Sequence, residues 1–458
     1  MFRGNRHPGP HGSSLVHLMT AHRRTTRRRM VIGSIIAAPL LAIGTLTAAA
    51  LAQPATGDAP VAPKAFRFAE HPARALAKAR MWNGPTDAAT LARDATRRDL
   101  VSLMQPVLGL PAGALGSPWR DIAPDDPLGK AARRAVERGW LTAPGGTVSL
   151  DGPATGWDAN RAWVLGLGMN RAVARLGRFA DGAGRRYQLP EGFAATIVAR
   201  EAGLRRNYPT GDDALERHDS QPMRLADLVL MASRGRSIRR RGTPRAVRAL
   251  QAFRIPAVDP VFVPTVQRAL LQVGSPYVWG GEWTDPNSPL DPQAAGGFDC
   301  SGLVWFVWYT GDRAVETAIT VPRGRTTYTM NVDRRGARIA WQRAQAGDLV
   351  FFGGAGRKTP LNRASHMGIS LGNKWMIHSS GGRGGVTISY LPTYWPAGLM
   401  NARSFRVTGD TPAVPEQPVT TAPAPAPVAP APAPAPSAPQ APAPAEPSPG
   451  APQAPAPS

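Results

Sequence analysis

Cysteine is nearly absent from this chain, because Cys300 is the only one in 458 residues. A single thiol cannot form an internal disulfide. Acidic residues are also scarce, with 31 against 54 lysines and arginines, and the formal net charge is +23. That balance suits an anionic partner such as a wall polymer or a membrane surface. The sequence has no zinc-ligand spacing, phosphate-binding glycine loop or aromatic RNA-binding motif, so nucleic acid is not an expected partner.

The N-terminal segment, residues 1–52, contains seven arginines and no acidic residue. Five of the arginines, within residues 23–29, lie directly before an apolar run from Met30 to Ala50, and the small-x-small pattern of residues 50–52 follows it. This order predicts a signal peptide, although an uncleaved run of this length would span a bilayer as an anchor. A membrane partner is therefore expected only without cleavage. In either case the rest of the protein is exported, where a lone cysteine has no disulfide role.

Cys300 lies at the predicted start of a buried helix. The motif 298–302 precedes an apolar, aromatic run at 303–309, and Asp299 is a favourable N-cap residue. A thiol at a helix N-terminus feels the positive end of the helix dipole, which favours the nucleophilic thiolate. The pattern predicts a cysteine nucleophile, and the alternative is a small buried apolar side chain.

Two of the four histidines outside the N-terminal segment flank a hairpin pattern. Alternating apolar residues on both sides of residues 372–373 predict two strands joined by a turn. A hairpin centred on Gly372 places His366 opposite His378, but only with a three-residue or bulged loop. The pair would be a base and the residue that orients it, or two metal ligands. A third ligand at close spacing is lacking, so we expect no metal and no other cofactor.

Residues 65–234 have an amphipathic, helical pattern. Helix starts recur in three stretches, at 95–101, 154–159 and 222–227, each after an acidic loop. A spacing near 60 residues predicts repeats that bury a core only together.

Residues 65–234 resemble three degenerate S-layer homology repeats, through Thr96-Arg97 and the segments 119–122 and 137–141. In that family the Thr-Arg start lines a pocket for wall polysaccharide. Only the first repeat keeps the Thr-Arg pair, so the resemblance implies a pocket there and leaves the other two in question. The alternative is a plain helical spacer.

The remaining segments differ in composition. Residues 53–64 form a Pro/Ala-rich linker, and the arginine-rich stretch 235–258 predicts a basic linker, exposed to solvent or in contact with anionic wall polymer. Residues 259–408 have strand patterns and glycine turns, and they are long enough for one independent core. Residues 409–458 alternate alanine and proline and are expected to be extended and disordered.

Residues 262–407 resemble the NlpC-type cell-wall cysteine peptidases. The matching motifs occur in the family's order: Pro276-Tyr277-x-Trp279-Gly280-Gly281, Phe298-Asp299-Cys300-Ser301-Gly302-Leu303, Val321-Pro322-Arg323, Ala346-Gly347-Asp348-Leu349-Val350-Phe351-Phe352, Ser365-His366-Met367-Gly368-Ile369 and Met376-Ile377-His378. The resemblance implies an α+β, papain-like domain with helices packed on a small antiparallel sheet, preceded by the all-α repeat domain. Two departures are an insertion at 282–295 and Gly324-Arg325-Thr326 after the Pro-Arg pair.

The resemblance also implies roles for the site residues. Cys300 would be the nucleophile, His366 the base and His378 the residue that orients the base. The substrate cleft would contain Tyr277, Asp299 and Ser301.

As a function, the resemblance implies a secreted, wall-associated hydrolase of peptidoglycan stem peptides that cuts after γ-linked D-glutamate. Two alternatives are a wall-binding adaptor with a silent catalytic domain, and a thiol amidase or acyltransferase acting on wall substrates.

Overall fold

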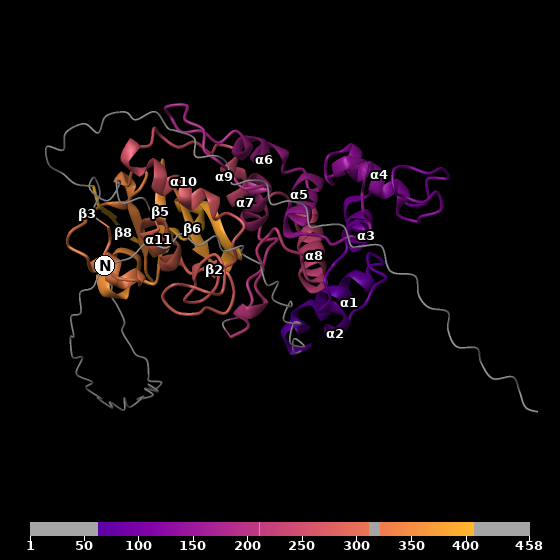
Figure 1. Ribbon diagram of the computed structural model, residues 1–458, viewed down its shortest axis with the longest axis horizontal. Helices are drawn as coiled ribbons and strands as arrows, with labels where there is room; N and C mark the ends of the chain where they lie inside the picture. Colours follow the sequence, from indigo (N-terminus) through magenta and orange to yellow (C-terminus); the bar gives the residue numbers. More distant parts are fainter. Residues whose placement is uncertain (1–62, 210, 311–320, 407–458) are drawn as a thin grey trace, which may run out of the picture. The chain divides into compact units, whose positions relative to one another are not determined.

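The computed structural model describes residues 63–209, 211–310 and 321–406 (Figure 1). The predicted signal segment, most of the first linker and the Ala/Pro-rich tail lie outside the described residues. All described residues fall within one unit of the chain, Pro60–Ser458. None of the described helices is both long enough and apolar enough to cross a membrane.

The first half of the described chain is helical, as the amphipathic pattern predicts. Its α-helices and 3-10 helices (η) are η1 (Pro63–Ala69), α1 (Glu70–Lys78), α2 (Ala88–Leu91), α3 (Arg97–Leu108), α4 (Gly129–Glu137), η2 (Pro144–Gly146), α5 (Gly156–Gly166), α6 (Asn170–Gly177), α7 (Phe193–Glu201), η3 (Asp213–Leu215), α8 (Leu225–Arg241) and α9 (Arg245–Leu250).

The starts of α3, α5 and α8 lie beside one another, joined by a ring of backbone hydrogen bonds. The Ala95 N–H donates to the Met223 carbonyl at 2.8 Å, the Met223 N–H to the Ala154 carbonyl at 2.8 Å, and the Ala154 N–H to the Ala95 carbonyl at 2.9 Å. The three stretches that resemble one another in sequence therefore occupy equivalent positions in this ring.

The ring members are capped differently. Thr96 and Thr155 each close a capping box with the aspartate three residues later, which satisfies orphan backbone donors at the helix start. Arg224, before α8, provides no side-chain cap. The third start therefore departs from the other two in structure as well as in sequence.

The stretch 235–258 is helical and partly buried where the arginine-rich sequence predicts a linker. α8 continues to Arg241, and α9 follows after a short break. Val247 and Leu250 are fully buried, and the Phe253 ring lies edge-on against the Trp375 ring of the sheet, 4.9 Å between centroids. Arginines occupy the outward positions of these helices. The high arginine content therefore led to the prediction of a linker, although apolar residues form a buried stripe.

The second half combines helices with an antiparallel sheet, as predicted. Six strands are ordered β3-β8-β4-β5-β6-β7, and β1 pairs separately with β2. The elements are η4 (Pro260–Phe262), α10 (Val263–Leu271), β1 (Glu282–Trp283), β2 (Gly297–Phe298), α11 (Cys300–Tyr309), α13 (Thr327–Val332), β3 (Ala337–Ile339), η5 (Trp341–Arg343), β4 (Leu349–Phe352), η6 (Gly356–Lys358), η7 (Leu361–Arg363), β5 (His366–Gly372), β6 (Trp375–Ser380), η8 (Gly381–Arg383), β7 (Gly385–Tyr390), α14 (Leu391–Tyr394), η9 (Pro396–Gly398) and β8 (Leu399–Ser404).

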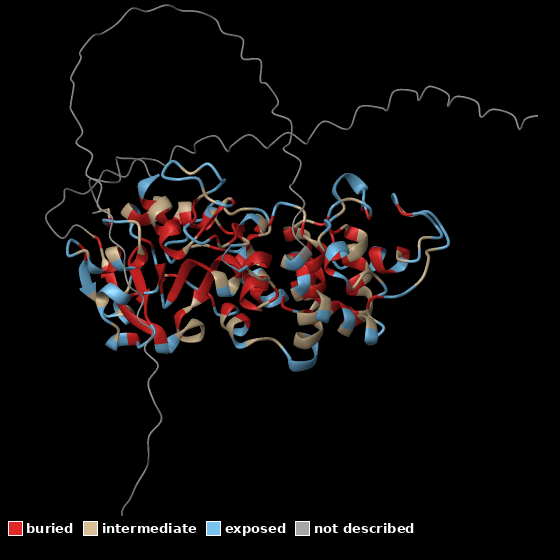
Figure 2. Cartoon of the chain, turned by 90° about the horizontal axis from the view of Figure 1, so that it is seen from below, coloured by how far each residue is buried: buried red, intermediate tan, exposed pale blue. Residues whose placement is uncertain are grey.

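The helical half and the sheet share one hydrophobic core. A single cluster of buried side chains includes Trp163 and Phe253 from the helices and Phe298 and Ile377 from the α+β half. Buried residues, red in Figure 2, occur along both the helices and the strands. The edge strand β7 is in contact with both α7 and α9. The helical half therefore covers part of the sheet, and the independence of the core at 259–408 stays a prediction.

Candidate active site

The N-terminus of α11 holds Cys300. Asp299 is the N-cap residue, as predicted, and its Oδ1 accepts hydrogen bonds from the Gly302 N–H at 2.6 Å and the Ser301 hydroxyl at 2.9 Å. A Cβ on Gly302 would lie 1.9 Å from the Gly281 carbonyl oxygen, so the glycine turn packs directly on this helix start. The motif thus combines a cap with a close backbone approach that only glycine permits.

Arg325 also stabilises this helix start through hydrogen bonds, and sequence reasoning missed it. Its Nη1 donates to Asp299 at 3.3 Å, and its Nη2 donates to the carbonyls of the glycine turn 280–281 at 2.9 and 3.1 Å. Its Nε pairs with the carboxylate of Glu282, the first residue of the insertion 282–295. The only sequence signal was its place in a segment that departs from the family pattern.

Asp299 and Ser301 are thus engaged in the helix start itself. Ser301 is 5% exposed, and Arg325 Nη1 donates to its hydroxyl at 3.0 Å. Their contact with substrate stays a prediction.

The structure brings His366 and His378 together. His366 is the first residue of β5, and its Nε2 lies 2.8 Å from Nδ1 of His378 on β6. Both side chains are buried, at 9% and 0% exposure. The bond uses one nitrogen of each ring, so Nδ1 of His366 is the nitrogen left for chemistry.

The register of the hairpin differs from the predicted one. The turn is formed by residues 373–374, with φ of 50° and 66°, and a bulge in β5 at 370–372 shifts the pairing. His378 therefore lies opposite Gly368 rather than His366, and a Cβ on Gly368 would approach the His378 Cβ to 2.9 Å. The histidines are diagonal neighbours on one face, because the bulge compensates for the two-residue turn.

Tyr394, the last residue of α14, is a further member of the site that no motif indicated. Its hydroxyl lies 3.2 Å from His366 Nε2 and 3.0 Å from the Ser380 hydroxyl, and its ring centroid is 4.5 Å from that of His378. Burial is the first cause that raises the pKa of Tyr394 to about 12, and Cys300 adds to it. The tyrosine therefore contacts both histidines and lies within electrostatic reach of the thiol.

The thiol of Cys300 is neutral in this arrangement, contrary to the expectation from the helix dipole. Burial and then the carboxylate of Asp299 raise its pKa to about 11. Sγ lies 3.4 Å from the Thr327 hydroxyl. The backbone of Met367, the neighbour of His366, acts in the opposite direction on the pKa of the thiol, so the sulfur lies beside the start of β5.

Both imidazoles are neutral as well. Burial lowers the pKa of His366 to about 4, and burial, then His366 and Arg383, lower that of His378 well below its usual value. A neutral imidazole can accept a proton, whereas an imidazolium cannot. The resting site is therefore a neutral thiol beside a neutral base, and the proton moves only when the thiol attacks.

Tyr277 lies within electrostatic reach of the thiol, and its contact with substrate stays a prediction. Burial and then Cys300 raise the pKa of Tyr277 above its usual value.

Across residues 63–209, 211–310 and 321–406, no three His, Cys, Asp or Glu side chains gather where they could hold a metal ion. The side-chain hydrogen bonds described for the two histidines are with each other and with hydroxyl groups.

Comparison with known proteins identifies the second half of the chain. Residues 274–404 match the model of the NlpC/P60 family. This segment is an NlpC/P60 domain. The "Peptidoglycan endopeptidase RipB" of Mycobacterium tuberculosis is 32% identical over 126 residues, which cover 27% of this chain and 45% of RipB. The "Bifunctional muramidase/DL-endopeptidase CwlT" of Bacillus subtilis is 36% identical over 138 residues, 29% of this chain and 34% of CwlT.

The matches are confined to a part of each protein. A solved structure of the RipB hydrolase from Mycobacterium tuberculosis is 30% identical, covers 32% of this chain and 65% of that chain, and has a TM-score of 0.25. The chain spans less than half the length of the curated relatives named above. The comparisons do not support the resemblance of residues 65–234 to S-layer homology repeats.

Proposed function

We propose that the NlpC/P60 domain hydrolyses stem peptides of peptidoglycan after γ-linked D-glutamate, with Cys300 as the nucleophile and His366 as the base. The observation that carries the proposal is the buried His366–His378 pair on β5 and β6, with the thiol at a helix start in reach of the backbone of Met367, the neighbour of His366. The names of the relatives, peptidoglycan endopeptidases, support the substrate class. The proposal requires a location outside the cytoplasm, which agrees with the predicted signal segment.

The proposed reaction moves one proton back and forth. As Sγ of Cys300 bonds to the carbonyl carbon, its proton passes to Nδ1 of His366, and the carbonyl oxygen becomes an oxyanion. Backbone N–H groups at the start of α11 would stabilise that oxyanion, at about 3 kcal/mol per donor. His366 then protonates the leaving amine, the C–N bond breaks, and water hydrolyses the thioester with His366 again as base.

Digestion of purified muropeptides tests the proposal. We expect two products whose combined mass exceeds that of the substrate by one water, with the break between D-glutamate and the third stem residue. Mass spectrometry of the fragments identifies the bond. A break at the bond to muramic acid would indicate an amidase instead, and products joined to an added amine would indicate an acyltransferase. Intact muropeptides together with wall binding would favour the adaptor.

A second proposal concerns the helical half, where we infer that the first repeat binds an anionic wall polymer. Arg97 lines a cavity of about 500 Å³, together with Thr155, Trp157 and Asp158. Arg97 is 6% exposed, and its Nε has no hydrogen-bond partner among the described residues. A buried unpaired donor costs about 1–3 kcal/mol, which a ligand oxygen would recover.

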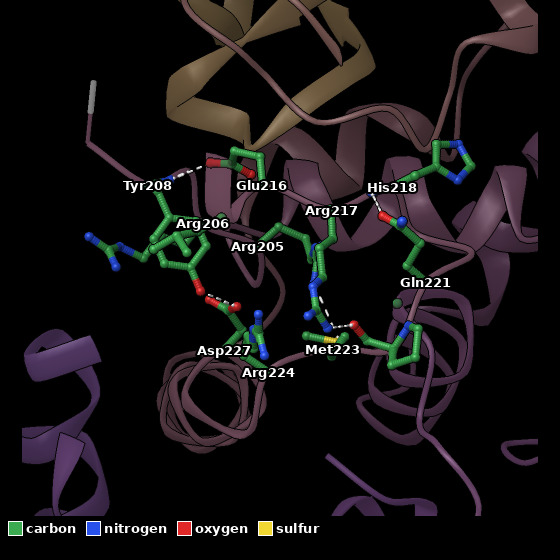
Figure 3. Close-up of a pocket in the computed structure, with 13 residues that line it drawn as sticks. Arg205, Arg206, Tyr208, Glu216, Arg217, His218, Gln221, Met223, Arg224 and Asp227 are labelled. Carbon is green, nitrogen blue, oxygen red and sulfur yellow. Dashed lines mark hydrogen bonds between the residues drawn. The ribbon is translucent and has the colours of Figure 1, made fainter. Parts of the chain in front are cut away.

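The corresponding cavity one repeat further on is smaller, about 20 Å³, and charged side chains line it (Figure 3). Gly156 occupies the position of Arg97 there, and the Tyr208 hydroxyl donates to Asp227 at 2.7 Å. Glu216 accepts the backbone N–H of Tyr208. Some arginine nitrogens at this cavity lack partners too, but Gly156 replaces the arginine of the Thr-Arg start, so the proposal is limited to the first repeat.

Sedimentation with purified cell walls tests polymer binding. We expect Arg97→Ala to weaken binding about tenfold, the effect of losing roughly 1.4 kcal/mol, and Arg97→Lys to restore it only in part, because lysine lacks the planar fork. Arg134→Ala, on the exposed face of α4, removes the same charge as a control. Equal losses in Arg97→Ala and Arg134→Ala would indicate general attraction by net charge and contradict a specific pocket.

A further inference from the structure

Glu201 is a buried acid that reaches the candidate active site from outside the NlpC/P60 domain. It is the last residue of α7, in the helical half, and is 2% exposed. The Ser389 hydroxyl donates to its Oε1 at 2.6 Å, and Arg383 Nε lies 3.5 Å from the same oxygen. No step of the proposed reaction so far uses this carboxyl group.

The contacts of Ser389 continue to the histidine pair. Its hydroxyl lies 2.9 Å from Nε2 of His378, whose Nδ1 lies 2.8 Å from Nε2 of His366. Glu201, Ser389, His378 and His366 therefore form one continuous hydrogen-bonded line, which we call the proton line. It begins in the helical half and ends at the proposed base.

We propose that Glu201 is a positioning residue for the thiol chemistry: its carboxylate fixes the direction of every hydrogen bond in the proton line and leaves Nδ1 of His366 unprotonated. The inference rests on the proposed function, because it assigns a role toward the same base.

The directions follow from counting protons. A carboxylate can only accept, so Ser389 gives its single proton to Glu201. The serine oxygen must then accept from His378, which places the proton of that neutral ring on Nε2. His378 Nδ1 consequently accepts from Nε2–H of His366. The one remaining nitrogen of His366, Nδ1, carries a lone pair and can take the thiol proton.

Every hydrogen bond of the proton line can run in the opposite direction when the Glu201 carboxylate is lost. Ser389 can then donate to His378, each later bond reverses, and Nδ1 of His366 carries a proton and cannot act as a base. Burial raises the pKa of Glu201 above its usual value, and Arg383 and then the Ser389 hydroxyl act in the opposite direction and favour the carboxylate. Tyr394 is the other titratable side chain that interacts electrostatically with Glu201. Its hydroxyl has Ser380 as a second partner, so the line does not depend on the tyrosine proton.

Kinetics of the full chain on muropeptides give the first test. We expect Glu201→Gln to lower kcat about 100-fold, the scale of a lost general base, with KM changed less than about twofold because no substrate contact is lost. Ser389→Ala should lower kcat by a similar factor. The double variant should lower kcat no further than either single variant, because each substitution interrupts the same proton line. Thr387→Val is the matched control, because it removes a buried hydroxyl from the same face of β7 that is outside the line and has no partner among the described residues.

Nitrogen-15 NMR of the histidine rings is the second test, and it does not require activity. We expect His366 protonated on Nε2 in the wild-type protein, with population shifted to the Nδ1–H form in Glu201→Gln. An unchanged tautomer in that variant, or an Nδ1–H form already in the wild type, would overturn the inference. A protein that cleaves no muropeptide but shows the expected tautomers would refute the proposed function and leave the role of Glu201 standing. Additive losses in the double variant would indicate two separate structural effects and reject the line.

Discussion

Replacing Cys300 by alanine is expected to abolish muropeptide cleavage, with a fall of about 10⁶-fold in kcat. Cys300 is the only cysteine of the 458 residues, so no other thiol can take over the attack. The fold should survive, because the substitution removes one sulfur atom whose hydrogen-bond partner is the Thr327 hydroxyl. Product analysis by mass spectrometry measures the activity, and urea unfolding measures the stability.

Cys300→Ser is the companion variant for that experiment. A serine hydroxyl keeps nearly the same volume and can still contact Thr327, but it is a weaker nucleophile than a thiol. We expect it to remain inactive while the wall binding of both variants equals that of the wild type. Cleavage by the alanine variant would show that the nucleophile lies elsewhere. Wall binding without cleavage by the wild type itself would favour the adaptor.

The features predicted from the sequence are those set by residues near one another in the chain. The cap at Asp299, the helix of Cys300 and the two strands of the histidine hairpin depend on local spacing. The register failed because a single bulged residue in β5, at 370–372, compensates for a two-residue turn. The alternation of apolar and polar residues predicts which residues share a face of a strand. It does not predict a bulge that shifts the pairing register.

The features that escaped prediction depend on contacts between distant segments. Arg325, Tyr394 and Glu201 reach the site from three different elements, and none belongs to a motif that names its partner. The charge state of the thiol was missed for a related reason. A helix terminus contributes about 0.3–1 kcal/mol in exposed settings, whereas the burial of Cys300, visible only in the fold, acts in the opposite direction and prevails.

Replacing Arg200 by methionine is expected to lower the free energy of unfolding by about 3–5 kcal/mol. Arg200 is fully buried on α7, and its Nη1 donates to the carbonyls of Ser275 at 3.0 Å and Val386 at 2.6 Å. Its Nη2 donates to the Gly274 carbonyl at 3.2 Å and pairs with Asp219 at 3.4 Å. Methionine fills most of the volume but removes all four of these contacts, although the Gly274 and Ser275 carbonyls keep the backbone N–H groups of Asp219 and Val386 as donors.

Arg205→Met is the matched control, because Arg205 pairs with the same Asp219, at 2.8 Å. The hydrogen bonds described for its side chain are with Asp219 and Met223, both in the helical half. We therefore expect a smaller loss, about 1–2 kcal/mol. Urea unfolding followed by tryptophan fluorescence compares the two variants. Equal losses would mean that the carbonyls of the NlpC/P60 domain contribute nothing.

The same experiment tests whether the helical half belongs to the catalytic unit. Arg200 and Glu201 are consecutive residues of α7. Arg200 donates to the backbone carbonyls of Ser275 and, on β7, Val386. Glu201 accepts a hydrogen bond from Ser389, also on β7. If the shared core is one cooperative unit, Arg200→Met should unfold in a single transition at lower urea, and cleavage should be lost in that transition. Two separate transitions, with cleavage surviving the first, would show that the NlpC/P60 domain is stable without the helices. That outcome would also remove the structural basis for a role of Glu201, because α7 could then leave the sheet without changing the base.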